Sequence, residues 1–371
     1  MNKQHSLALK TLRWILGTYI ILCIGIATLK YAYGPSASLS FQEGITWFWH
    51  FYENWIKTFF IIICSILTLK IIAQSKKRST MHKRNLIGLI IIALLVHIIL
   101  PICLDNKELY VYAMPFPWTT APLQHLYEAQ SMAQSPNTTF TILGIAGISA
   151  SFVFYLSINL FIFIGTLLFG RRLQCSTLCL FNGFASEVFG IGMPLIGKRK
   201  KVGSKALKGL TMLRWVFLMI TLFFGFWWLL KLCGIHLFGE LNTIDKLETI
   251  KYLGAELLMA LFFWVAFFDR VYCYYCPVGT ILGLISKLAG QKITTDRTHC
   301  VSCNQCNIAC PMTIDIASNA KEGLPVQNLR CVGCGHCIDA CPTQNLSYST
   351  HFLDCISKNS THSNQSHSTK L

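Results

Sequence analysis

Two cysteine-rich stretches near the carboxyl end of the chain repeat one pattern. The first is Cys300-Val-Ser-Cys303-Asn-Gln-Cys306-Asn-Ile-Ala-Cys310-Pro311, and the second is Cys331-Val-Gly-Cys334-Gly-His-Cys337-Ile-Asp-Ala-Cys341-Pro342. Each stretch has the spacing Cys-x2-Cys-x2-Cys-x3-Cys-Pro. Three thiolates separated by two residues on a tight loop can reach three corners of one iron–sulfur cube, so the fourth ligand must come from elsewhere.

This pattern resembles the cysteine runs of bacterial two-cluster ferredoxins, in which the other run supplies the fourth thiolate. We therefore expect cluster 1 on Cys300, Cys303, Cys306 and Cys341, and cluster 2 on Cys331, Cys334, Cys337 and Cys310. Pro311 and Pro342 keep the backbone out of a helix at the preceding cysteine. A zinc site and a disulfide framework are the alternatives. Neither explains the doubled three-plus-one pattern with its two Cys-Pro ends.

The composition of the whole chain is that of a membrane protein. Of its 371 residues, 53% are hydrophobic and only 13% are charged, yet the formal net charge is +16. In such a chain a basic excess usually lies in loops held on the cytoplasmic side, so we expect membrane lipid and no nucleic acid among the partners.

Six stretches are apolar enough to cross a membrane as helices: residues 12–29, 55–73, 86–104, 141–169, 212–233 and 253–268. Basic residues concentrate at the amino end, at 76–84, at 171–208 and after 269. The positive-inside rule then predicts a multi-pass protein of the cell membrane with both termini and the clusters in the cytoplasm. Reduced thiols persist in that compartment.

The predicted fold is an α-helical integral membrane protein of about six transmembrane helices with a carboxyl-terminal α+β ferredoxin domain. We divide it into an N-terminal membrane region with three helices (1–104), an extracytoplasmic loop (105–140), a second membrane bundle with three helices and cytoplasmic cysteine-pair segments (141–290), the ferredoxin domain (291–350) and a disordered tail (351–371).

Two further cysteine pairs occupy matching places in the second bundle. Cys175 and Cys179 follow one predicted span, and Cys273 and Cys276 follow another, so the arrangement indicates an internal repeat. A shared four-thiolate site could hold a metal or an additional iron–sulfur centre at the membrane surface. A dithiol relay and a purely structural role are the other interpretations.

From about residue 140 to 348, this order of parts resembles membrane polyferredoxins of the NapH and NosR type, and it is related in layout to CcoG-type oxidase-assembly proteins. The resemblance implies quinol-linked electron delivery. The family motif is Cys-x3-Cys-Pro, whereas here Leu180 replaces the first proline and only two residues separate Cys273 from Cys276. Residues 1–104 have no counterpart in that resemblance.

His97 lies inside a predicted span, four residues before Pro101. An ionisable group at this depth is a candidate haem ligand, quinone contact or proton carrier. The sequence favours a plainer interpretation, in which a neutral histidine hydrogen-bonds to a neighbouring helix or to a carbonyl released by the proline kink.

Together these features predict an iron–sulfur protein that transfers electrons between a quinone pool, or a partner subunit, and an acceptor in a respiratory chain. No acid/base pair, nucleophile triad or phosphate loop indicates a self-contained catalytic site, although the chain could be a quinol dehydrogenase subunit. The alternatives are a membrane assembly or redox-regulatory protein for a metalloenzyme, and clusters that act only as structural staples.

Overall fold

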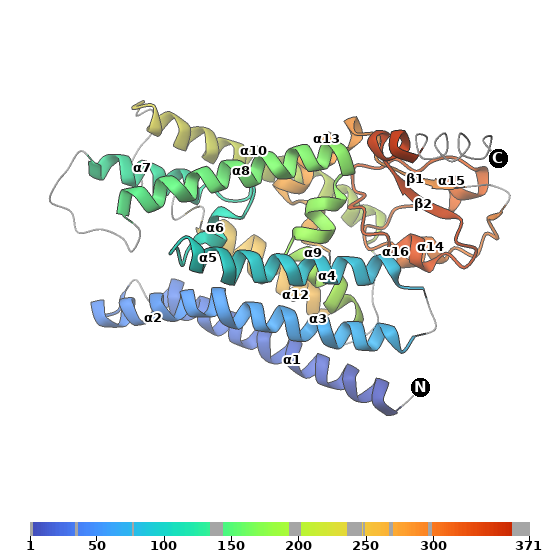
Figure 1. Ribbon diagram of the computed structural model, residues 1–371, viewed down its shortest axis with the longest axis horizontal. Helices are drawn as coiled ribbons and strands as arrows, with labels where there is room; N and C mark the ends of the chain where they lie inside the picture. Colours follow the sequence, from blue (N-terminus) through green and yellow to red (C-terminus); the bar gives the residue numbers. More distant parts are fainter. Residues whose placement is uncertain are drawn as a thin grey trace, which may run out of the picture.

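The computed structural model describes residues 3–33, 36–75, 78–133, 144–192, 202–235, 247, 249–266, 270–295 and 299–357. Helices dominate it (Figure 1). The first part of the chain forms α1 (Lys3–Thr28), α2 (Leu39–Phe51), α3 (Lys57–Ala73), α4 (Thr80–Leu94) and α5 (Leu100–Cys103). Short π-helical segments at Leu29–Tyr33, Tyr52–Ile56 and Leu95–Ile99 extend or join these helices.

The second part contains α6 (Leu109–Tyr112), α7 (Ala121–Ala133), α8 (Gly144–Phe169), α9 (Asn182–Gly192), α10 (Ser204–Leu232), α12 (Met259–Ala266) and α13 (Pro277–Leu288). Helix α9 follows the π-helical segment Leu173–Leu178, and α12 follows another at Lys251–Leu258.

Five helices in the described part of the chain are long and apolar enough to cross a membrane: Leu7–Tyr31, Leu39–Ala73, Thr80–Cys103, Ile148–Phe169 and Ser204–Leu232. They correspond to the first five predicted spans. At the place of the sixth, the apolar stretch Glu256–Val265 is shorter than a span, and residues 267–269 lie outside the described residues. The count of six therefore stays a prediction.

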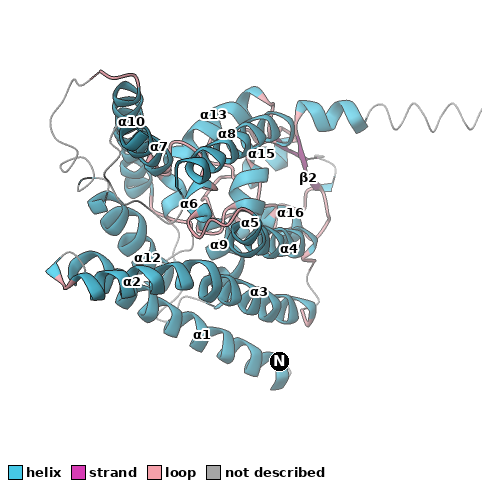
Figure 2. Ribbon diagram, turned by 60° about the vertical axis from the view of Figure 1, so that its left-hand side comes forward, coloured by secondary structure: helices cyan, strands magenta, loops and turns pink. Residues whose placement is uncertain are grey.

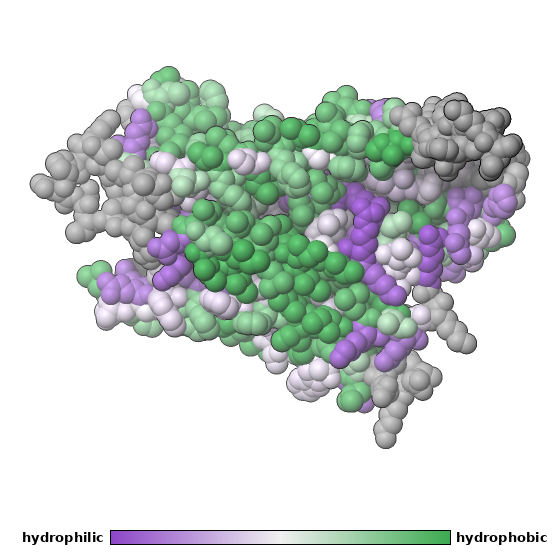
Figure 3. Space-filling view, in the orientation of Figure 1, coloured by the Kyte–Doolittle hydropathy of each residue, from purple (hydrophilic) through white to green (hydrophobic). Residues whose placement is uncertain are grey.

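The outer surface of these helices is strongly apolar. Phe59, Ile63 and Ile66 of α3 and Ile87 and Ile91 of α4 are exposed. Figure 3 shows a broad hydrophobic area across the middle of this face, with hydrophilic residues gathered toward the two ends. Such an area is typical of a surface that faces lipid tails. Helices suit this environment because their backbone N–H and C=O groups are hydrogen-bonded within the helix.

The first three long helices share one core with the second bundle. Leu16 of α1, Ile61 of α3 and Leu89 of α4 are buried in the same cluster as Val188 of α9 and Trp264 of α12. Figure 2 shows α3, α4, α9 and α12 on the same side of the molecule. Residues 1–104 are thus not a separate packing unit, because α9 packs against all three of their long helices.

The ferredoxin domain lies at the same end of the molecule as the beginning of α1 (Figure 1). Its two strands, β1 (Lys292–Thr295) and β2 (Leu346–Ser349), pair antiparallel, with Lys292 opposite Ser349. Between them lie α14 (Gln305–Ala309), α15 (Ala317–Glu322) and α16 (His336–Ala340). The α+β prediction for this domain agrees with these elements.

Two predicted irregular regions contain helices. The predicted extracytoplasmic loop 105–140 contains α6 and α7, and Leu109 and Tyr112 are buried. The predicted disordered tail begins too early, because residues 351–357 are helical. Phe352 packs edge-on against Phe169 of α8, and Asp354 pairs with Lys292 at 2.8 Å, so these contacts order the segment. The remainder of the tail, 358–371, lies outside the described residues.

A carboxylate of the ferredoxin domain caps a membrane helix. Oδ2 of Asp339 in α16 accepts hydrogen bonds from the backbone N–H groups of Met81 (2.9 Å) and His82 (3.1 Å) in the first turn of α4. The preceding Ser79 makes no side-chain cap. Because helix N-termini leave N–H groups without partners and carry partial positive charge, Asp339 fixes the position of the domain on the bundle.

We expect the Asp339→Ala variant to lose about 1 kcal/mol of stability, the usual cost of removing an N-terminal cap. Thermal unfolding of the purified protein in detergent should show a lower midpoint. Glu322→Ala, at an exposed carboxylate of the same domain, is the matched control. Equal midpoints for the two variants would contradict the capping role.

Candidate functional site

The two cysteine runs have nearly the same backbone. Asn304 (φ 60°) and Gly335 (φ 78°) are both left-handed, and each precedes a five-residue helix, α14 or α16. Cys310 and Cys341 end these helices with φ/ψ of −73°/113° and −74°/114°. The sequence repeat is therefore also a structural repeat, in which each helix carries its last cysteine away from its own loop.

This geometry brings the fourth cysteine of each run toward the other run. The Cys310 thiol interacts electrostatically with those of Cys331, Cys334 and Cys337, and Cys341 interacts with Cys306. A pocket is lined by Cys310 and the three cysteines of the second run, together with apolar side chains such as Ile314 and Val326. The residues fit the crossed assignment of two [4Fe-4S] clusters, which would supply one-electron transfer when bound.

The two cluster sites differ in exposure. Cys334 and Cys337 are buried, and the peptide at Gly335 lies against Met81 of α4. Cys303 is exposed, and Cys300, Cys306 and Cys341 are half-buried. Cluster 2 would thus face the membrane bundle, while cluster 1 would lie toward solvent.

The other two cysteine pairs form one group of four thiols, which we call the four-thiol site. Cys175 lies in the π-helical segment Leu173–Leu178 and Cys179 follows it, whereas Cys273 lies in a short 3-10 helix and Cys276 is the N-cap of α13. The Cys273 and Cys276 thiols each interact electrostatically with those of both Cys175 and Cys179. The predicted internal repeat thus brings the two pairs together.

Four thiols are the donor set of a tetrahedral metal ion and also of an iron–sulfur cluster, so the chemistry of the four-thiol site suits either group.

Two fully buried arginines flank the four-thiol site. Nε of Arg171 donates to Sγ of Cys175 at 3.1 Å, and Nη1 of Arg270 donates to the Cys175 carbonyl at 3.0 Å and lies 4.0 Å from Sγ of Cys273. Burial alone lowers the pKa of Arg171, but the thiols of Cys175, Cys273 and Cys276 outweigh burial and raise it. Burial raises the pKa of the Cys179, Cys273 and Cys276 thiols, so these groups would become thiolates on binding a metal ion or cluster, and the two arginines would then balance their charge.

The helix start at Cys276 adds to this electrostatic environment. The backbone N–H of Gly279 donates to Sγ of Cys276 at 3.4 Å, and Pro277 occupies the first turn of α13. A Cβ at Gly279 would come within 2.3 Å of Nη2 of Arg171, so glycine allows the guanidinium to pack on the helix start. A helix N-terminus and an arginine both stabilise a thiolate.

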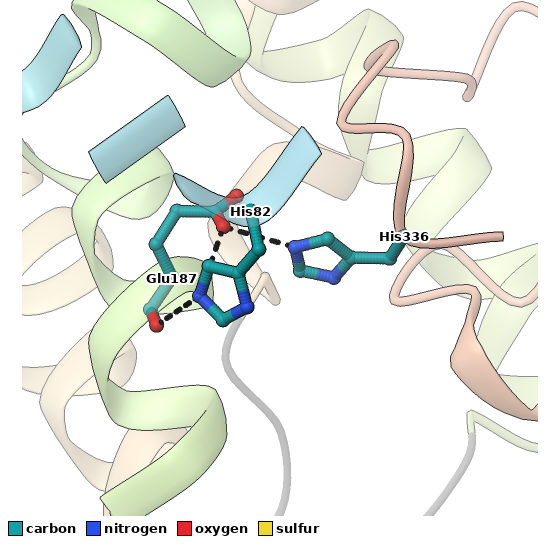
Figure 4. Close-up of side chains that lie close together, drawn as sticks. All are labelled: His82, Glu187 and His336. Atoms are coloured by element: carbon teal, nitrogen blue, oxygen red, sulfur yellow. Dashed lines mark hydrogen bonds and ion pairs between the residues drawn. The ribbon is translucent and has the colours of Figure 1, made fainter. Parts of the chain in front are cut away.

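A third feature connects the four-thiol site with cluster 2. Glu187 of α9 is fully buried and accepts contacts from His336 (3.0 Å) and His82 (3.2 Å) at Oε2, and from Asn85 (3.1 Å) and Arg270 (3.6 Å) at Oε1. Figure 4 shows the two imidazole rings converging on this carboxylate from different elements. We call Glu187 and these partners the Glu187 hub. It joins α4, α9 and the ferredoxin domain.

The contacts of the Glu187 hub account for the closeness of its carboxylate and two histidines without a metal ion. His82, Glu187 and His336 have the spacing of a metal site. However, Nε2 of His82 is already 2.7 Å from the backbone carbonyl of Glu187, and the buried Arg270 supplies positive charge to the carboxylate. Burial raises the pKa of Glu187, but His336, His82 and Arg270 outweigh it and hold the pKa at about 2. The ionised hub therefore stabilises the fold above pH 4.5, the ordinary value of the group, and this stabilisation is lost as the pH falls toward 2.

Two chains of contacts lead from the four-thiol site to cluster 2. In one, Arg171 contacts Cys175 and its backbone N–H donates to Oε1 of Gln291 (2.8 Å), whose Nε2 donates to the Cys331 carbonyl (3.0 Å). In the other, Arg270 contacts Glu187, which contacts Asn85, whose Nδ2 donates to the Cys334 carbonyl (2.9 Å). Each cysteine pair is thus connected to the second cysteine run.

His97 adopts the plainer of its predicted arrangements. Its Nδ1 lies 2.7 Å from the carbonyl oxygen of Glu53, on the neighbouring helical segment, and its ring stacks on Tyr110. The side chain is 4% exposed. This is the hydrogen bond to a neighbouring helix that the sequence favours.

Sequence reasoning missed Arg171, Arg270 and Glu187. Arg171 was expected to be a basic residue at the membrane edge, yet the structure buries it completely. The sequence did contain a signal for the two arginines, because each cysteine pair has one shortly before it. Arg171 lies four residues before Cys175, and Arg270 lies three residues before Cys273. Nothing in the chain order indicates that Glu187 meets His82 and His336, which are 105 and 149 residues away.

We expect Glu187→Gln to destabilise the protein by about 3 kcal/mol or more, because it leaves the buried Arg270 charge without its counter-charge. The measurement is the thermal unfolding midpoint in detergent at neutral pH, with Glu43→Gln at an exposed position of α2 as the control. A midpoint equal to that of wild type would show that Arg270 does not depend on this carboxylate.

Comparison with known proteins agrees with this geometry. Residues 292–350 match the family model of the 4Fe-4S dicluster domain. The chain is 28% identical to the uncharacterized protein MJ0749 of Methanocaldococcus jannaschii over 149 residues, which cover 39% of this chain and 53% of that protein. It is 26% identical over 173 residues, 42% of this chain and 45% of the relative, to a protein of Escherichia coli named "Putative electron transport protein YccM". The chain spans about half the length of these curated relatives. No solved structure matches it.

Its carboxyl-terminal domain is a 4Fe-4S dicluster domain, and these similarities support an iron–sulfur electron-transfer protein.

Proposed function

We propose that this protein transfers electrons between a membrane quinone pool, or a partner subunit, and an acceptor in a respiratory chain. The observation that carries the proposal is the four-thiol site, which lies between the membrane bundle and the second cysteine run and is connected to that run by two chains of buried contacts. Clusters that only stabilise the fold of the ferredoxin domain would not require a second group of thiols between that domain and the membrane bundle.

The chain's own residues set up this arrangement. Arg171 and Arg270 would balance the charge of the thiolates when a metal ion or cluster is bound, and Gln291 and Asn85 donate hydrogen bonds to carbonyl oxygens of the second cysteine run. Hydrogen bonding, burial and nearby charge are the means by which a protein sets the potential of an iron–sulfur centre. Cys303 is exposed, so cluster 1 is the site that an acceptor protein could approach.

The protein type and the side of the membrane on which the clusters lie are part of the same proposal. The order of cysteine motifs supports a protein of the NapH and NosR type, and the basic residues near the ferredoxin end support a cytoplasmic location for the clusters. The beginning of α1 lies at this same end of the molecule (Figure 1), in keeping with an amino terminus on that side.

The four-thiol site makes a prediction about iron content. Three four-iron clusters would give about 12 iron atoms per chain, whereas the ferredoxin domain alone would give about 8. Anaerobically purified wild-type protein should contain about 12, and the double variant Cys179→Ser/Cys276→Ser about 8, measured by iron and acid-labile sulfide analysis. Cys103→Ser/Cys233→Ser, at two exposed cysteines outside the motifs, is the control. A wild-type value of about 8 would restrict the clusters to the ferredoxin domain.

Electron exchange with quinone is tested by reducing the protein without oxygen, recording the paramagnetic signal of its clusters, and adding a menaquinone analogue. We expect rapid loss of the signal. In the single variants Cys303→Ser and Cys334→Ser we expect the exchange to be abolished, because each removes a ligand of one cluster. Cys355→Ser, an exposed cysteine outside the motifs, should behave as wild type.

Intact clusters that do not respond to quinone would contradict the quinone-linked function. Electrons delivered by a partner subunit, or an assembly or redox-regulatory role, would then have to be separated by co-purification of the partner.

A further inference from the structure

A cavity of about 450 Å³ lies between the first three long helices and the four-thiol site. This volume is within the usual range for small-molecule sites. Its walls are mostly apolar and aromatic, and they include Cys179 and Leu178 on one side and Tyr52 and Val96 on another. A ligand in this cavity would therefore lie against one of the four thiols.

One wall carries a buried ionic group inside candidate membrane spans. Nζ of Lys57 lies 2.6 Å from Oε2 of Glu53, and the backbone carbonyl of Glu53 contacts Nδ1 of His97. Glu53 is 5% exposed and His97 is 4% exposed. Charged groups at this depth are costly and are kept mainly where they have a function.

A second polar group on the wall has an ion-pair contact but no hydrogen bond. His50 of α2 is 6% exposed, and neither of its ring nitrogens has a hydrogen-bond partner among the residues that the structure describes. The nearest carboxylate oxygen, Oε1 of Glu108, lies 3.4 Å from its Nε2. A buried imidazole without hydrogen bonds is unfavourable, so its presence on a cavity wall indicates a polar ligand.

The side of the cavity near the thiols holds a second buried carboxylate. Oε2 of Glu256 accepts from Nε1 of Trp118 (3.1 Å), and Oε1 accepts from the Tyr272 hydroxyl (2.9 Å) and pairs with Nζ of Lys251 (3.1 Å). Tyr272 directly precedes Cys273 of the four-thiol site. The rings of Trp118, Phe181 and Tyr272 contact one another here.

We propose that this cavity binds the headgroup of a membrane quinone or quinol. The flat ring would lie among the aromatic side chains, and its oxygen substituents would hydrogen-bond to polar groups of the wall, including His50, whose ring nitrogens make no hydrogen bond among the described residues. A quinone is apolar enough to reach a cavity between membrane helices, and its hydroxyl or carbonyl oxygens match sparse polar groups. The inference rests on the proposed exchange with a quinone pool and adds where the quinone binds. It gives the second long helix, which contributes His50 and Glu53, and the third, which contributes Val96, a role in that exchange.

Binding can be measured apart from electron transfer. The probe is a fluorescent hydroxyquinoline N-oxide analogue of quinol, titrated with the full-length protein in lipid nanodiscs without oxygen. We expect one site per chain. Val96→Phe, which adds a ring to the cavity wall, should weaken binding about tenfold or more. Leu95→Phe, at the adjacent residue on the outer face of the same helical segment, should bind as wild type.

A second pair of variants tests the polar wall. Glu53→Gln should also weaken binding about tenfold, because it removes the buried charge on the wall, and Glu43→Gln on exposed α2 surface should leave it unchanged. The inference is overturned if wild type shows no saturable binding, or if Val96→Phe and Glu53→Gln, each folded and with full iron content, bind as tightly as wild type.

The same preparations separate this inference from the proposed function. Saturable probe binding that Val96→Phe weakens, in a protein whose clusters do not respond to quinone, supports the cavity and contradicts quinone-linked transfer. Clusters that quinone reoxidises equally fast in wild type, Val96→Phe and Glu53→Gln support the function and overturn the cavity as its quinone site.

Discussion

Three buried charges, on Arg171, Arg270 and Glu187, govern how the parts of this protein fit together. A charge removed from water is tolerated only where an opposite charge and well-placed hydrogen bonds replace the solvent. Arg171 meets the thiol of Cys175, and Arg270 lies between the four-thiol site and Glu187. Glu187 in turn meets histidines from α4 and from the ferredoxin domain. If one element moves, a buried charge loses its partner, so the elements are held in one arrangement.

This arrangement fixes where the three groups of cysteines lie relative to one another. The second cysteine run is buried against α4 and connected to the four-thiol site, while the first run lies toward solvent and exposes Cys303. The cap that Asp339 places on α4 and the hydrogen bond from the Tyr348 hydroxyl to the Phe169 carbonyl hold the domain in this orientation. Because the two runs have nearly the same backbone, their different surroundings, and not their loop geometry, distinguish the two sites.

The first three long helices complete the bundle. They enclose α9, the helix that carries Glu187, and they close one side of the cavity that reaches Cys179. Their buried polar residues lie on that inner side, whereas their outer faces present apolar side chains such as Ile63 and Ile91. A bundle without these helices would expose both the hub and the cavity to lipid or water.

The sequence by itself determined the features that depend on local spacing and composition. The cysteine intervals predicted a two-cluster domain, and apolar length predicted the five long helices. The repeat of cysteine pairs after two spans indicated that they belong together. Only the tertiary structure decided which distant residues meet. Glu187 contacts His336 across 149 residues, and Arg171 is buried although its position beside Arg172 suggested a basic membrane edge. The physical reason is that intervals along a chain report which residues share a loop or a helix face, whereas the partner of a buried charge is chosen by how helices pack, and one sequence alone does not reveal that packing.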